Sequence, residues 1–225
     1  MKNKNYYSLI EQNQTKFETY YNELISYNMK VNLTAITDKQ DVFTKHFLDS
    51  ILGIDVIPQG AKLIDIGAGA GFPSLPIKIV RPDIELTMLD SLNKRITFLD
   101  LLTTKLSIKS NNVHARAEEY CMKHREEYDV AVARAVASLD TLVEYLLPFV
   151  KVGGIVLAYK GSNIDTEVIS AKKAISTLGG EISDILHFDL PNKMGERNIV
   201  VIKKVKTTPN KYPRQQNKPK TNPIK

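Results

Sequence analysis

The sequence predicts an α/β fold built on a mostly parallel sheet, and three observations carry that prediction. Short β-rich runs alternate with helical segments from Lys62 onward, which is the pattern of βαβ units. The first run, residues 62–66, breaks into a glycine turn at residues 67–71. The last two runs, residues 182–190 and 198–205, follow each other without a helix between them. We therefore expect them to pair as an antiparallel hairpin at the end of the sheet.

The remaining elements follow in chain order. Apolar residues at helical spacing predict an amphipathic helix over residues 6–27. Thr37 and Gln40 have the spacing of a capping box, and the apolar residues after them, up to Ile51, mark one face of a second helix. His46 falls on or beside that face, and we interpret it as a structural histidine rather than a binding or catalytic one. Further strands are expected near residues 85–89, 113–115, 129–133 and 154–159, and further helices over residues 73–80, 92–106, 139–147 and 164–178, with a short one after Ala117.

Composition limits the classes of protein. The 225 residues, 43% of them hydrophobic, suffice for one domain with a real core. A single cysteine, Cys121, excludes an internal disulfide framework and a cysteine-rich zinc site, so we expect a reducing compartment and no metal. No apolar run approaches the roughly 18 residues of a membrane span, and the start of the chain is polar. We expect a cytoplasmic monomer with no membrane contact.

The net charge of +6 is concentrated in residues 206–225, which hold six basic residues, four prolines and no acid. This composition is typical of extended, poorly packed chain that contacts a polyanion, and it is equally typical of a solvated tail without function. We accordingly divide the chain into a helical part (residues 1–58) packed on the core, an α/β domain (59–205) and a basic, proline-containing tail (206–225).

The glycine turn is the first candidate for a ligand site. Gly67, Gly69 and Gly71 lack Cβ atoms, so they can adopt positive φ and let a ligand lie against the backbone near helix N–H groups. Pro73 suits the start of the following helix. Ligands of parallel sheets bind beyond the carboxyl ends of the strands. The turn therefore predicts a nucleotide-like ligand.

Asp90 is the second candidate, since it ends the next strand, 23 residues after Gly67. A carboxylate there accepts hydrogen bonds from both hydroxyls of a ribose; a plain carboxylate at a helix start is the alternative. The dinucleotide fingerprint does not fit, because Phe72 occupies the position of its last glycine. The spacing of Asp65 and the three glycines is instead the form used for S-adenosylmethionine.

Four motifs resemble those of the RsmG family, also called GidB, which methylates N7 of a guanine in bacterial 16S ribosomal RNA with S-adenosylmethionine. These motifs are Asp65–Pro76 (DIGAGAGFPSLP), Leu89–Leu99 (LDSLNKRITFL), Arg116–Glu119 (RAEE) and Ala133–Leu139 (ARAVASL), and the likeness extends to residues 32–34, 46–51, 160–161, 196–197 and 212–214. The resemblance implies a Rossmann-like class I S-adenosylmethionine-dependent methyltransferase fold, with a seven-stranded sheet, a terminal antiparallel hairpin and N-terminal helices. It also implies 16S ribosomal RNA or the small ribosomal subunit as partner.

The resemblance also implies roles for individual residues. Gly67 and Phe72 would contact the cofactor, Ala117 and Glu118 would hold its adenine end, and Arg134 would lie at the rim of the active site. The residues alone, without the resemblance, predict that Phe72 is a packing residue. Arg134 is our candidate positioning residue for catalysis. It would bind a phosphate or the guanine O6, or it would support the cofactor pocket. A structural ion pair is the alternative. The predicted cofactor-binding set is Gly67, Gly69, Gly71, Phe72, Asp90, Ala117, Glu118 and Arg134.

Residue chemistry narrows the atom that is methylated. The Asn/Asp-Pro-Pro-aromatic motif of exocyclic amine methylation is absent after the fourth strand, where the sequence reads Ala-Arg134-Ala-Val. Methylation of pyrimidine C5 needs a cysteine nucleophile, and Cys121 lies in a segment where we expect packing. Guanine N7 has a free lone pair and no proton, so its methylation requires positioning more than a base. Three alternatives stay open: a methyltransferase of small molecules or proteins, a non-catalytic RNA-binding assembly factor, and an NAD-dependent oxidoreductase.

Overall fold

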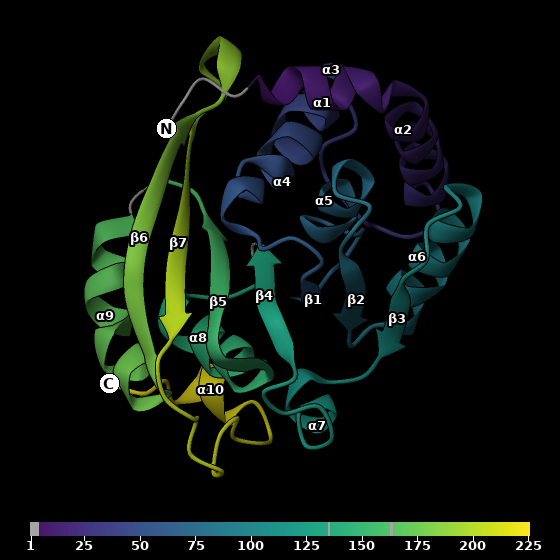
Figure 1. Ribbon diagram of the computed structural model, residues 1–225. Coiled ribbons are helices and arrows are strands. Elements are labelled where there is room, and N and C mark those ends of the chain that lie inside the picture. Colours follow the sequence, from purple (N-terminus) through teal and green to yellow (C-terminus); the bar gives the residue numbers. More distant parts are fainter. Residues whose placement is uncertain (1–4, 135, 163) are drawn as a thin grey trace.

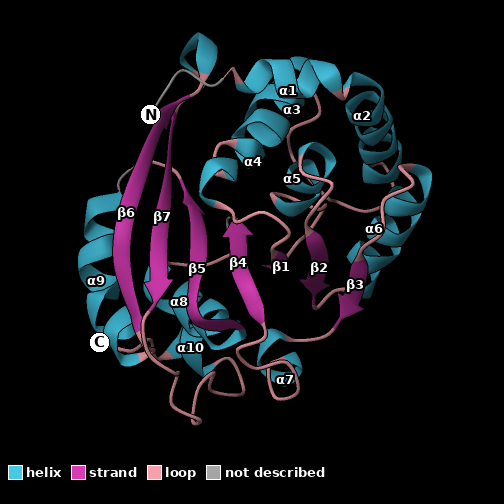
Figure 2. Cartoon of the chain, in the orientation of Figure 1, coloured by secondary structure: helices cyan, strands magenta, loops and turns pink. Residues whose placement is uncertain are grey.

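A seven-stranded sheet forms the centre of the computed structural model, which describes residues 5–134, 136–162 and 164–225 (Figures 1 and 2). The strand order is β3-β2-β1-β4-β5-β7-β6. β7 runs antiparallel to its neighbours, β5 and β6, and the other neighbouring strands are parallel, so the predicted parallel sheet with a terminal antiparallel pair is confirmed. The strands are β1 (Lys62–Ile66), β2 (Glu85–Asp90), β3 (Asn111–His114), β4 (Tyr128–Arg134), β5 (Val150–Lys160), β6 (Gly180–Asp189) and β7 (Glu196–Lys204).

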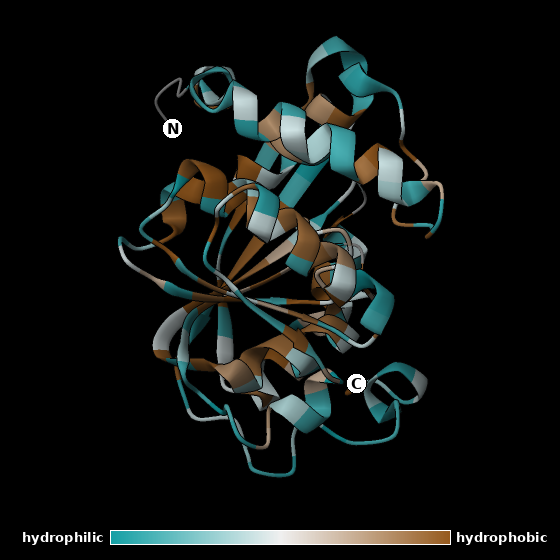
Figure 3. Ribbon diagram, turned by 90° about the vertical axis from the view of Figure 1, so that its right-hand side faces the viewer, coloured by the Kyte–Doolittle hydropathy of each residue, from teal (hydrophilic) through white to brown (hydrophobic). Residues whose placement is uncertain are grey.

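Helices cover both faces of the sheet, and successive strand residues point to opposite faces. Leu63 and Val130 belong to one hydrophobic cluster, whereas Ile64 and Ala131 belong to the other, and all four are fully buried. Figure 3 shows these hydrophobic strands between two layers of helices. Within the described residues no helix is both long and apolar enough to cross a membrane. The helices after β1 are α5 (Ser74–Val80), α6 (Asn93–Lys105), α7 (Ala117–Tyr120), α8 (Leu139–Leu146), α9 (Ile164–Thr177) and α10 (Lys218–Thr221). Short 3₁₀ turns lie before β1 at Ile54–Val56 and after it at Leu147–Phe149 and Pro191–Lys193.

The prediction of one continuous helix over residues 6–27 is wrong, because Asn13 divides this segment into two helices. They are α1 (Tyr6–Gln12) and α2 (Gln14–Asn28). The Asn13 side-chain amide donates to the Leu9 carbonyl (2.9 Å), and its backbone adopts φ −116° and ψ 22°. Asparagine competes in this way for backbone hydrogen bonds. Residues 1–4, part of the polar start of the chain, lie outside the described residues.

The second predicted helix differs in its start and in its winding. Its N-cap is Asp38 rather than Thr37, because the Asp41 amide donates to Asp38 Oδ1 (3.0 Å). The helix begins as α3 (Lys39–Val42), widens into a π-helical segment, η1 (Phe43–Leu48), and ends as α4 (Asp49–Ile51). A π-helical segment changes which residues share a face, and a periodicity of 3.6 residues does not predict it.

The C-terminal tail is packed on the domain, so the expectation of a poorly packed chain is wrong. Thr208 and Tyr212 are buried. The guanidinium of Arg125 donates to the carbonyls of both residues, at 2.6 Å each. Glu144, fully buried, accepts hydrogen bonds from Nε (2.8 Å) and Nη2 (2.7 Å) of Arg214. These partners lie far away in the sequence, and composition carries no signal for them.

Candidate active site

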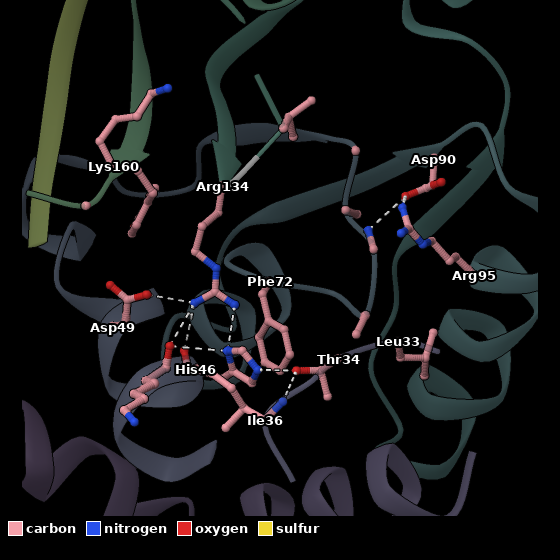
Figure 4. A pocket seen from close by; sticks show the side chains of 18 of the residues that line it. Leu33, Thr34, Ile36, His46, Asp49, Phe72, Asp90, Arg95, Arg134 and Lys160 are labelled. Atoms are coloured by element: carbon pink, nitrogen blue, oxygen red, sulfur yellow. Dashed lines mark hydrogen bonds and ion pairs between the residues drawn. The ribbon is translucent and has the colours of Figure 1, made fainter. Parts of the chain in front are cut away.

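Two adjoining pockets lie at the carboxyl ends of the first strands. The larger, of about 790 Å³, extends from the glycine turn to the π-helical segment (Figure 4). The smaller, of about 320 Å³, lies toward α7. Both are lined by Gly67, Asp90, Ser91 and Val136, so they are neighbouring parts of one cleft. Their sizes are typical of small-molecule sites.

Gly67 and Gly69 line the cleft with bare backbone. Their φ angles are 75° and 60°, which is the left-handed region that glycine tolerates best. A Cβ atom added to Gly69 would meet only the Gly67 carbonyl, at 3.9 Å, so a side chain there would project into open space. The Ala70 N–H has no acceptor among the described residues. The turn therefore offers a ligand one free backbone donor.

Gly71 has a packing role that the sequence did not predict. It does not line either pocket, and its φ is 96°. A Cβ atom there would lie 2.7 Å from the Tyr20 hydroxyl and 3.1 Å from a Leu99 methyl group. The glycine lets the turn pack against the N-terminal helices, and its place in the predicted cofactor-binding set stays a prediction.

Asp90 has the helix-start role that the sequence offered as the alternative, and its ribose contact stays a prediction. Its Oδ1 accepts the Leu92 N–H (2.9 Å) at the start of α6, and its Oδ2 accepts the Gly69 N–H (2.9 Å) and Arg95 Nη1 (3.2 Å). It also faces both pockets, although only 3% of it is exposed. Because a carboxylate offers about four acceptor positions, one remains for a ligand hydroxyl.

The Phe72 ring is packed between other side chains. Tyr20 stacks parallel to it with centroids 5.3 Å apart, His46 stacks at 4.5 Å, and Cζ of Arg134 lies 4.8 Å from its centroid. Only 7% of Phe72 is exposed. The ring therefore shapes the pocket wall, as the residue alone suggested, and the cofactor contact implied by the resemblance stays a prediction.

Arg134 connects the end of β4 to the N-terminal helices (Figure 4). Its Nη1 donates to Asp49 Oδ2 (2.8 Å) and to the carbonyls of Lys45 (3.3 Å) and His46 (3.4 Å) in the π-helical segment. Its Nη2 lies 3.2 Å from His46 Nδ1. Nε and the second hydrogen of Nη2 have no acceptor among the described residues, so the side chain supports the pocket and keeps two donors for a ligand.

His46 is neutral and has no nitrogen free for proton transfer. Nδ1 lies 3.2 Å from Arg134 Nη2, which can only donate, and 3.2 Å from the Lys45 carbonyl, which can only accept. Nε2 lies within hydrogen-bond distance of Thr34 Oγ1 (2.8 Å). Burial, together with the positive charges of Arg134 and Arg197, lowers the pKa of His46 to about 3. The side chain of His46 is fixed by hydrogen bonds within the fold, as expected of a structural histidine, and it also lines the pocket.

Two buried carboxyl groups flank the arginine. Burial raises the pKa of Asp49, even though Arg134 and Arg197 oppose the shift. Burial also raises the pKa of Asp65, to about 7. The Ser74 amide donates to Asp65 Oδ2 (3.3 Å), whereas Asp65 Oδ1 and Ser74 Oγ have no partner among the described residues. No group of three or more histidine, cysteine or acidic side chains in the described chain could hold a metal ion.

The smaller pocket contains Ala117 and Glu118, the residues that the resemblance assigns to the adenine end. Glu118 is buried, and its Oε1 accepts from Arg116 Nε (2.8 Å). Asn217 and Lys220 of the tail also line this pocket, a contribution that the sequence did not predict.

Several lining residues of the larger pocket were missed. They are Thr34, His46, Asp49, Lys160 and Arg197. A signal existed, because all of them fall within the outlying segments of the resemblance, residues 32–34, 46–51, 160–161 and 196–197. Within the second helix, His46 and Asp49 are also polar residues beside an otherwise apolar face.

The sheet order, the terminal antiparallel pair and the cleft at the glycine turn define the fold of a class I methyltransferase. The crystal structure of M. jannaschii TYW2 in complex with AdoMet has this fold, with a TM-score of 0.56, 13% identity, and coverage of 75% of this chain and 77% of that chain. The [4+2]-cyclase SpnF is also similar, with a TM-score of 0.55, 16% identity and coverage of 71% and 82%. The fold alone therefore does not fix the reaction.

Sequence relatives identify the family. Residues 13–200 match the family model GidB, described as rRNA small subunit methyltransferase G. The protein named ribosomal RNA small subunit methyltransferase G of Acetivibrio thermocellus is 50% identical, over 93% of this chain and 88% of its own. The protein of the same name in Bacillus subtilis is 47% identical, over 96% and 93%. The chain belongs to this family of methyltransferases, and the resemblance found in the sequence is confirmed.

Proposed function

We propose that this enzyme transfers a methyl group from S-adenosylmethionine to N7 of a guanine in 16S ribosomal RNA, free or within the small ribosomal subunit. Family membership supports the methyl transfer and the RNA. The observation that favours N7 is the pairing of His46: both nitrogens of this pocket residue are occupied and its pKa is about 3. We further infer that the enzyme acts in the cytoplasm as a monomer.

The cleft fits the cofactor in its shape and its polar groups. Gly67 and Gly69 leave the space that a Cβ atom would take, the Ala70 N–H is a free donor for a carboxylate, and Asp90 retains an acceptor for a ribose hydroxyl. The adjoining pockets provide separate places for the adenosine and the amino acid end. When bound, S-adenosylmethionine supplies a methyl group activated by a sulfonium.

The charge balance of the reaction requires no base in the pocket. The N7 lone pair forms the new N–C bond, and the electrons of the S–C bond return to sulfur. The positive charge thereby passes from sulfur to the purine, and no proton is released at N7. Methylation of an exocyclic amine would require a proton acceptor. His46 does not provide one, because it is neutral and both of its ring nitrogens are hydrogen-bonded. Position is therefore the main contribution of the site.

Transfer of labelled methyl from S-adenosylmethionine tests this proposal. We expect labelling of 16S RNA or of 30S particles taken from cells that lack the enzyme, and mass spectrometry should find 7-methylguanine. Gly69→Val, whose side chain enters the cleft, should abolish the transfer. Gly153→Ala is a matched control, because it also replaces a glycine of positive φ (92°) with open space around it, but one that lines neither pocket. Label on another atom, or on no RNA, would overturn the assignment.

A further inference from the structure

The C-terminal tail forms one wall of the smaller pocket. Asn217 and Lys220 line this pocket together with Gly67, Asp90 and Ala117. Figure 1 shows α10, in yellow, beside α8. A segment more than 75 residues beyond α7 in the sequence therefore meets the strand ends at the same pocket.

The tail is hydrogen-bonded to the segment that contains the predicted adenine contact, Ala117 and Glu118. Arg116 Nη2 donates to Asn217 Oδ1 (2.7 Å), and Gln215 Nε2 donates to the Glu118 carbonyl (3.1 Å). Arg116 and Glu118 are neighbours in the segment that opens α7, and Arg116 Nε also binds the Glu118 carboxylate (2.8 Å). The wall of the pocket is thus built from two segments fastened to each other.

Two donor groups of the tail have no acceptor among the described residues. Asn217 adopts φ 57°, a left-handed conformation for which asparagine is enriched. Since its Oδ1 is held by Arg116, its amide N–H groups are left without an acceptor among the described residues. The Lys220 ammonium likewise has no acceptor in the described part of the chain. The following turn is fastened because Thr141 Oγ1 donates to the carbonyl of the buried Pro219 (3.1 Å).

Adenosine has the complementary groups. Its ring nitrogens and ribose oxygens accept hydrogen bonds, while Asp90, which lines the same pocket, accepts from hydroxyl groups. We propose that residues 215–220 are the outer wall of the adenosine pocket and that Asn217 and Lys220 donate hydrogen bonds to the adenosine part of the cofactor. This inference rests on the proposed function for the identity of that cofactor.

Calorimetry on the full chain tests the inference with two ligands, S-adenosylhomocysteine and 5′-methylthioadenosine, which lacks the amino acid end. Asn217→Ala and Lys220→Ala should each weaken both ligands by about five- to tenfold, the effect of one lost hydrogen bond. Lys211→Ala is the matched control, since this tail lysine does not line the smaller pocket, and its affinities should not change. Thermal melting in the absence of ligand checks that each variant is folded.

The variant Asn217→Asp distinguishes a contact of Asn217 with the ligand from its hydrogen bond to Arg116. Aspartate keeps the oxygen that binds Arg116 but has no N–H group, so we expect it to weaken binding at least as much as Asn217→Ala. Wild-type affinity in Asn217→Asp and Lys220→Ala would overturn the inference while the proposed function stands. Failure of the wild-type chain to bind S-adenosylhomocysteine would instead overturn the cofactor assignment in the proposed function itself.

Discussion

The glycine turn and the C-terminal tail meet at the same pocket, yet different forces hold them. The turn is fixed by its own backbone: the N–H groups of Gly67 and Ala68 donate to the Leu89 carbonyl at 2.8 and 3.1 Å. The tail is fixed by side chains from distant segments, such as the pairs of Glu144 with Arg214 and of Arg125 with three tail carbonyls. The turn thus depends on the absence of side chains, and the tail on the presence of a few.

Loss of a tail anchor should have the largest effect on stability. Glu144→Ala removes a fully buried carboxylate that accepts the Arg214 amide (2.9 Å), Nε (2.8 Å) and Nη2 (2.7 Å). Breaking such a pair should lower the free energy of unfolding by about 3 kcal/mol, measured by urea denaturation. Glu119→Ala, at an exposed site, is the control and should change it by less than about 0.5 kcal/mol. A loss below about 1 kcal/mol for Glu144→Ala would mean that the tail is held by other contacts.

Substitutions of Gly69 and Gly71 should distinguish an effect on ligand binding from an effect on folding. Both have positive φ, so alanine costs about 1 kcal/mol at either position. At Gly71 the Cβ atom also meets the Tyr20 hydroxyl at 2.7 Å, and overpacking adds about 1–2 kcal/mol. Gly71→Ala should therefore destabilise the fold by about 2–3 kcal/mol, while Gly69→Ala should mainly weaken S-adenosylhomocysteine binding. Equal losses of stability in urea denaturation would contradict this division.

The same contrast explains what the sequence could predict. The glycine turn, Asp90 and the strand alternation are local patterns, and each was found at its predicted place in the sheet. The role of Gly71 was missed because its constraint comes from Tyr20, 51 residues earlier in the chain. The pocket wall at Asn217 was missed for the same reason: its partner, Arg116, lies 101 residues away. The π-helical segment that presents His46 leaves no trace in a 3.6-residue periodicity.

The histidine behind the turn should make stability depend on pH. Folding lowers the pKa of His46 from 6.5 to about 3, so between these values the unfolded chain binds a proton that the folded chain does not. His46 should therefore contribute a fall of about 1–2 kcal/mol in the free energy of unfolding between pH 7 and pH 5, whereas Asp65, whose pKa burial raises to about 7, contributes in the opposite direction. His46→Asn does not titrate, and it should reduce this slope in urea denaturation. The same change at the exposed His114 serves as control, and an unchanged slope in His46→Asn would assign the effect to other groups.

Substitutions of the exposed tail lysines should have the smallest effects on stability, and they should change only the binding of RNA. Lys206 and Lys211 are exposed and form no ion pair among the described residues, so replacing either with alanine should change stability by less than about 0.5 kcal/mol. Each lysine that contacts a phosphate should reduce the slope of log K against log salt by about 0.7–0.9, measured by titration of 16S RNA at several salt concentrations. Cofactor affinity should not change, in contrast to Asn217→Ala. A salt slope that stays at the wild-type value in the double variant would confine the role of the tail to its inner side, where it forms the wall of the pocket.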